Sequence, residues 1–163
     1  RCRAQRGQKV AADRRRHPPG VGVEQEDRGL VVDQVAFLVV RPVAAGLQPQ
    51  RHAGRVEAAV STCRRALQLG ASPVAIAAAL ANKVGAVARL YSARGDQYSL
   101  ASQTGLAPYV VKMTQPVARR WSADNVTKAV ILVSELDAAV KGQGGEPEFA
   151  LEAAVKRVAE LAR

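Results

Sequence analysis

The sequence has few of the side chains that usually carry out chemistry. Among 163 residues there are two cysteines, two histidines and one tryptophan, and aromatic residues make up 4% of the chain. His17 and His52 both lie in a stretch without a regular pattern, so neither forms a recognisable metal-ligand pair. Cys2 and Cys63 lie far apart in the sequence, which argues for reduced thiols rather than a disulfide framework. We expect no catalytic residues, no metal, no cofactor and no small-molecule substrate.

Long apolar runs are also missing. The most apolar region, residues 30–47, is interrupted by Asp33, Arg41 and Pro42, so it cannot cross a bilayer as a continuous apolar helix of about 20 residues. It lacks the cleavage site of a secretory signal. We therefore expect a cytoplasmic protein with no membrane partner. Because the chain starts at Arg1 rather than at Met, we also expect a fragment of a longer protein.

Acidic residues are fewer than basic ones. The chain has 24 Lys and Arg against 14 Asp and Glu, a formal net charge of +10, and a pI of about 10.4. Such a balance favours nucleic acid or acidic partners. Residues 1–55 carry +6 of this charge and residues 56–163 carry +4, so the charge is concentrated towards the N-terminus.

Residues 1–52 show neither a sustained helical period nor clear start and stop signals. Basic residues and prolines between Arg14 and Pro19 stand among scattered glycines and glutamines. Val31–Val40 could form a strand, but a lone strand has no partner here. We leave residues 1–52 unassigned, as a poorly structured basic segment that is disordered or non-native.

From Ala53 onward, helices begin and end at recognisable residues. Glycines are placed to end helices in the left-handed conformation, prolines suit the first turns, and Ser99 and Ser122 suit N-caps. Pro116 removes a hydrogen bond inside one helix, so we expect a kink or break there. The pattern predicts an all-α fold, a compact bundle of about six helices within residues 53–163. The expected helices span residues 56–70, 73–91, 99–104, 108–121, 122–141 and 147–163, with predicted buried stripes that include Cys63, Ile76, Val110, Met113, Trp121, Val130, Val133 and Phe149.

Residues 100–112 have the outline of a helix-turn-helix DNA reader: a short helix, a turn at Gly105 and a second helix. Pro116 argues against this reading, because a bent recognition helix fits the major groove less readily. A helix-turn-helix DNA-binding protein remains the alternative function. In it, Tyr109, Lys112 and Gln115 would approach base edges, and Arg119 and Arg120 would contact phosphates.

Four short motifs follow one another in the second half of the chain. They are Pro108-Tyr109-Val110-Val111-Lys112, Arg119-Arg120-Trp121-Ser122, the stretch from Leu136-Asp137 to Lys141-Gly142, and Pro147-Glu148-Phe149-Ala150-Leu151-Glu152. In this order they resemble the C-terminal, collar-forming domain of the delta subunit of bacterial DNA polymerase III, a clamp-loader component. The resemblance extends over residues 53–163, and Pro116 departs from it.

The resemblance implies a domain that packs beside other clamp-loader subunits in a ring called the collar. Its partners would be the other clamp-loader subunits of DNA polymerase III, and primed DNA would be reached indirectly, through the complex. The chain would belong to a DNA-directed DNA polymerase holoenzyme, a nucleotidyltransferase, without polymerase chemistry of its own. Candidate contacts to partners or nucleic acid are Tyr109, Lys112, Arg119, Arg120, Trp121 and Phe149, and a core role remains open for Trp121.

Overall fold

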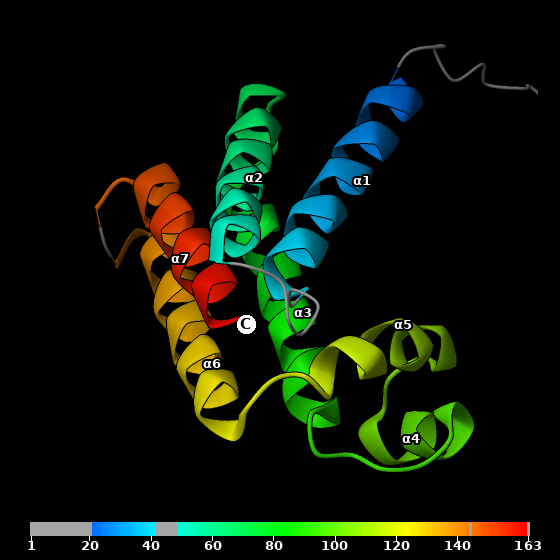
Figure 1. Ribbon diagram of the computed structural model, residues 1–163. Coiled ribbons are helices and arrows are strands. Elements are labelled where there is room, and N and C mark those ends of the chain that lie inside the picture. Colours follow the sequence, from blue (N-terminus) through cyan, green and yellow to red (C-terminus); the bar gives the residue numbers. More distant parts are fainter. Residues whose placement is uncertain (1–20, 42–48, 144, 163) are drawn as a thin grey trace, which may run out of the picture.

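The computed structural model describes residues 21–41, 49–143 and 145–162 (Figure 1). These ranges contain seven α-helices, one short wider turn and no strand. The predicted all-α bundle is confirmed, with one helix more than the six expected. The elements are α1 (Val21–Val40), α2 (Pro49–Gln68), α3 (Pro73–Leu90), α4 (Gln97–Thr104), α5 (Pro108–Ala118), α6 (Ala123–Ala138), the turn η1 (Ala139–Gln143) and α7 (Pro147–Leu161).

Five of the helices form a closed ring. α1 packs on α2, α2 on α7, α7 on α6, α6 on α3, and α3 returns to α1. The other two helices form a hairpin outside this ring, in which α4 packs on α5 and α5 packs on α3. Figure 1 shows the α4–α5 hairpin at one end of the bundle. The ring holds the core, and the hairpin extends from it.

The core consists of one buried stripe from each helix of the ring. α3 contributes Ile76, Leu80, Val84 and Val87, which recur at helical spacing and are all buried. Cys63 lies in the same core, as predicted. The sequence pattern therefore identifies the inner faces of most helices correctly. The other stripes of the ring are Val35–Val40 in α1, Val56–Ala66 in α2, Val126–Val140 across α6 and η1, and Leu151–Ala162 in α7.

Three of the predicted stripe positions are wrong: Met113, Val130 and Phe149 are exposed. In α5 the buried residues are Val111, Thr114 and Ala118, so the inner face lies about one position further along than predicted. The cause is local, because apolar residues stand on both sides of this short helix and the pattern does not choose between them.

Most predicted helix ends are confirmed. Gly70, Gly105 and Gly142 all have positive φ at or near helix ends, and Ser122 Oγ accepts a hydrogen bond from Asn125 N at 3.2 Å. The predicted Ser99 cap is wrong, because Asp96 caps α4 and the helix begins at Gln97.

The predicted break at Pro116 does not occur. α5 continues through Pro116 to Ala118. A proline this close to the end of a helix removes one backbone hydrogen bond, and the neighbouring turns are sufficient to maintain the helix.

Helix α1 lies in the segment that the sequence left unassigned. The strand considered for Val31–Val40 is wrong, since these residues are helical. Val35, Ala36, Val39 and Val40 are buried, and this spacing places them on one side of the helix. At the end of α1, the buried Trp121 indole donates from Nε1 to Val40 O at 3.0 Å. Residues 49–52 of the same segment form the first turn of α2, and residues 1–20 and 42–48 lie outside the described ranges.

Within the described ranges, α3 is the one helix that is long and apolar enough to cross a membrane by length and composition. Its apolar side chains pack against α1, α5 and α6. The buried central helix of a helical bundle has the same length and apolar composition as a membrane-spanning helix, and α3 has this central position.

Replacing Val133 with Asp tests the inner face of α6. Val133 is 7% exposed, so an aspartate there would be an unpaired charge in the core. We expect Val133→Asp to lower the free energy of unfolding by about 3 kcal/mol or more in urea denaturation. Ile131→Asp is the control on the same helix, because Ile131 is 52% exposed. Equal losses in the two variants would contradict this orientation of α6.

Trp121→Phe tests the contact that holds α1 to the rest of the bundle. The phenyl ring keeps an aromatic side chain in place but cannot donate to Val40 O. We expect a loss of about 1–2 kcal/mol of stability, because a buried hydrogen bond is removed. Amide hydrogen exchange should accelerate most in the last turn of α1. Equal acceleration in every helix would show that this bond does not hold α1 specifically.

Candidate functional site

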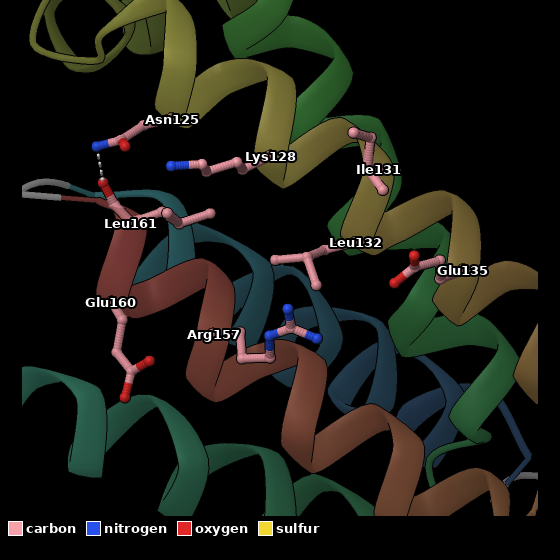
Figure 2. A pocket seen from close by; sticks show the side chains of 8 residues that line it. All are labelled: Asn125, Lys128, Ile131, Leu132, Glu135, Arg157, Glu160 and Leu161. Atoms are coloured by element: carbon pink, nitrogen blue, oxygen red, sulfur yellow. Dashed lines mark hydrogen bonds between the residues drawn. The ribbon is translucent and has the colours of Figure 1, made fainter.

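A groove follows the line along which α6 and α7 pack on each other. Where α6 begins and α7 ends, it opens into a hollow of about 550 Å³ (Figure 2). Both apolar and polar side chains line the hollow. The lining residues are Asn125, Lys128, Ile131, Leu132 and Glu135 from α6, and Arg157, Glu160 and Leu161 from α7.

A second hollow of about 140 Å³ continues the groove toward the start of α7. It shares Leu132, Glu135 and Arg157 with the first. The remaining lining is apolar and mostly small, so a partner's side chains could approach the two helices closely. These residues are Leu136, Ala139, Ala150, Ala153 and Ala154.

Charges of both signs stand on the walls of the groove. Figure 2 shows Glu135 of α6 and Arg157 of α7 pointing toward one another from opposite sides. At the open end, Asn125 Nδ2 donates to Leu161 O at 2.8 Å and ties the start of α6 to the end of α7. An apolar floor with mixed charges at its edge is typical of a surface that binds protein.

Four of the six predicted contact residues lie on or next to the outer side of α5. The helix buries its opposite side against α3 and α4. Tyr109 is 71% exposed, and Lys112, Arg119 and Arg120 are exposed with it. The spacing of Tyr109, Lys112 and Arg119 places them along one side of α5. The structure therefore brings an aromatic ring and several basic groups together on one surface.

The other two predicted contact residues do not join them. Trp121 is 6% exposed, and its indole bonds to Val40 O inside the bundle, so it takes the core role and has no surface to offer a partner. Phe149 is 79% exposed, but it lies in the first turn of α7, on the ring rather than on the α4–α5 hairpin.

The described residues contain no group of three or more His, Cys, Asp or Glu side chains that could hold a metal ion. Cys63 lies in the core, where burial, helped by the negative charge of Glu152, raises the pKa of its thiol to about 11. A thiol with this pKa is neutral at pH 7, and its thiolate is the reactive form. Cys63 is therefore a small apolar core residue, as predicted.

The sequence pattern does not predict two features of the structure. The first is the α6–α7 groove, because it forms between two helices and packing alone decides which of their sides face each other.

The second is a hydrogen bond between α2 and the end of α7. Arg55 Nη2 of α2 donates to Ala162 O at 2.7 Å, so this backbone carbonyl at the end of α7 has a hydrogen-bond partner. Burial, followed by the positive charges of Arg41 and Arg120, lowers the pKa of Arg55. A partner 107 positions away gives no local signal, although a basic residue near a helix C-terminus is a known stabilising arrangement.

Residues 50–158 match the family model described as the DNA polymerase III delta subunit, C-terminal domain. The chain belongs to this family. The match begins in the first turn of α2 and ends in the last turns of α7, so it contains the α6–α7 groove and the α4–α5 hairpin. No curated protein and no solved structure matches the chain.

Membership of the delta family confirms the resemblance given by the four motifs, and gives the chain a role as a clamp-loader subunit of DNA polymerase III in replication. The family match begins at residue 50 and so does not include α1, which ends at Val40. In this member of the delta family, α1 nevertheless packs against α2, α3 and α7.

The raised pKa of Cys63 is testable by NMR. In a Cys2→Ser variant, the Cβ chemical shift of Cys63 should titrate with a midpoint near 11. The unfolded chain ionises this thiol near its ordinary pKa of 9.0. Its contribution to stability is therefore present below about pH 9 and is lost as the pH rises toward 11. A midpoint at or below 9 would contradict a buried thiol.

Proposed function

We propose that this delta-family chain is an assembly module of the clamp loader. Its helical domain docks in the collar on the helical domain of a neighbouring clamp-loader subunit, and the α6–α7 groove is the docking surface. Primed DNA is reached indirectly, through the assembled complex in the cytoplasm. The chain serves a DNA polymerase holoenzyme and carries out no nucleotidyl transfer of its own.

The observation that carries this proposal is the apolar outer surface beside the groove. Ile131 of α6 lines the groove and is 52% exposed, although the inner stripe of that helix already fills the core. Large branched side chains of this kind gain free energy when a partner removes them from water. The small alanines of α7 that line the second hollow leave room for a helix to lie close.

The dimensions of the groove fit a partner helix. Its two hollows lie end to end, from Asn125 in α6 to Ala139 at the start of η1 and from Ala150 to Leu161 in α7. A helix that lies in such a groove places apolar residues on the floor and polar residues at the charged walls. A neighbouring subunit that is itself a helical bundle offers this kind of surface.

Ala153→Trp tests the docking surface by filling the groove. Ala153 is exposed and lines the second hollow, so the larger side chain should block a partner without disturbing the core. We expect the full chain with this change to co-elute with the other clamp-loader subunits at least about tenfold more weakly, because a centrally placed contact is lost.

Ala58→Trp is the matched control. Ala58 is exposed on α2, away from the groove, and the same change there should leave co-elution within about twofold of the unmodified chain. Circular dichroism should be the same for both variants. Normal co-elution of the Ala153→Trp protein would contradict docking through the groove.

A further inference from the structure

Four segments of the chain meet where α1 ends. The indole of Trp121, which lies between α5 and α6, donates from Nε1 to Val40 O at 3.0 Å. In the same part of the bundle, Arg55 Nη2 of α2 donates to Ala162 O at 2.7 Å. Figure 1 shows the ends of α1 and α7 close to the start of α2. We call this meeting point of α1, α2, the α5–α6 connection and α7 the junction.

Three arginines lie at the junction. Arg41 directly follows Val40, which accepts the indole hydrogen bond. Arg120 directly precedes Trp121, which donates the same bond, so this bond brings the two arginines to one place. Both are exposed. Burial, followed by the positive charges of Arg41 and Arg120, lowers the pKa of Arg55, so the third arginine lies within reach of the other two.

The Arg55 guanidinium is held at one nitrogen and has donors left over. Nη2 donates to Ala162 O at 2.7 Å and, less closely, to Ala159 O at 3.4 Å. Within the part of the chain that the structure describes, Nε and Nη1 are shielded from solvent and have no hydrogen-bond partner. A buried donor without an acceptor costs free energy, and the cost is greater for a charged group. An anionic acceptor would remove this cost.

The junction is held together by contacts that need no ligand. Asn125 Nδ2 donates to Leu161 O at 2.8 Å, which ties the start of α6 to the end of α7. Arg41 Cζ lies 5.9 Å from the centre of the Phe37 ring, so this guanidinium stays near the end of α1. A site that is ordered before binding loses less conformational entropy when a ligand arrives.

A phosphate dianion suits this arrangement. Arginine forms strong, charge-assisted hydrogen bonds with phosphate oxygens. Neighbouring guanidinium groups repel one another, and a doubly charged anion offsets more of this repulsion than a single carboxylate does. The unpaired donors of Arg55 are shielded, so an extended polyanion cannot lie against all three arginines, whereas a small anion can enter when the exposed pair turns.

We propose that Arg41, Arg55 and Arg120 form a binding site for a phosphate dianion at the junction. Arg41 and Arg120 turn toward the anion from the surface, and Arg55 donates to it from a nitrogen that is not bonded to α7. The bound anion links α1 to the family-matched part of the chain and stabilises closure of the ring. The site is separate from the α6–α7 groove, so this proposal and docking through that groove can fail independently.

Isothermal titration calorimetry of the full chain with sodium phosphate, at neutral pH in about 100 mM NaCl, tests the site. We expect one phosphate per chain with a Kd of about 1 mM or lower. Arg41→Gln combined with Arg120→Gln should raise the Kd at least about tenfold, because two charge-assisted contacts are lost. Both side chains are exposed, so this variant should fold.

Arg65→Gln combined with Lys141→Gln is the matched control. It also removes two exposed positive charges, but from the last turn of α2 and from η1, at the other end of the bundle. Its Kd for phosphate should stay within about twofold of the unmodified chain. Equal losses in the two double variants, or no binding of phosphate at about 20 mM, would overturn the proposal.

Arg55→Lys tests the inner arginine, because lysine keeps the charge but has fewer donors in a different geometry. We expect it to raise the Kd at least about threefold. Phosphate should also slow amide hydrogen exchange in the last turn of α1 of the unmodified chain, and have no such effect in the Arg41 and Arg120 double variant. Equal slowing in both proteins would indicate a general salt effect and would overturn the proposal.

Two competing anions complete the test. Thymidine monophosphate carries a terminal phosphate dianion, so tighter binding of this nucleotide than of inorganic phosphate, lost in the double variant, would identify a nucleotide as the source of the anion. If a 20-mer of oligothymidylate displaces phosphate from the unmodified chain, the arginines contact a nucleic-acid backbone, and the small-anion site is wrong.

Discussion

Closure of the ring of five helices is the constraint on which the rest of this structure depends. Each of these helices has one apolar stripe, and none can bury that stripe unless its two neighbours are in place. Aromatic residues are scarce, so the core is built mainly from valine, leucine and alanine, and its cohesion comes from many small contacts. Helix α1 closes the ring, because its buried valines pack against α3. The backbone carbonyl of Val40, at the end of α1, also accepts a hydrogen bond from the indole of Trp121.

Once the ring is closed, its outer faces are left to make contacts with other molecules, and they differ in character. The α6–α7 side is slightly acidic in sequence and carries a groove with an apolar floor, whereas the α4–α5 hairpin is basic and carries exposed tyrosines. The two sides therefore differ in charge, and the groove side has the apolar floor and mixed charges typical of a surface that binds protein. Because the chain belongs to the delta family, both surfaces are those of a protein of DNA replication.

Much of the fold could be predicted from the sequence because proline and glycine delimit helices whose apolar residues keep a helical period. Ile76 and Val133 are predicted core residues on that basis, and both are buried. The prediction failed where local signals conflict or where packing decides. Val31–Val40 is rich in β-branched residues and has no start signal, so its helix depends on distant partners. Val110 and Val111 are equally apolar, and only contact with α3 selects Val111. The exposed Tyr109 could be named in advance, but the groove could not, since it exists only between two packed helices.

The central claim is that the ring is a complete core whose α6–α7 side is covered by a sister subunit. Hydroxyl-radical footprinting of the chain, alone and within the assembled clamp loader without DNA, tests it directly by measuring side-chain accessibility. The account predicts that oxidation of Ile131 falls sharply on assembly, while Tyr98 and Tyr109 remain as reactive as in the isolated chain. Unchanged oxidation of Ile131, with protection elsewhere on the ring, would contradict it.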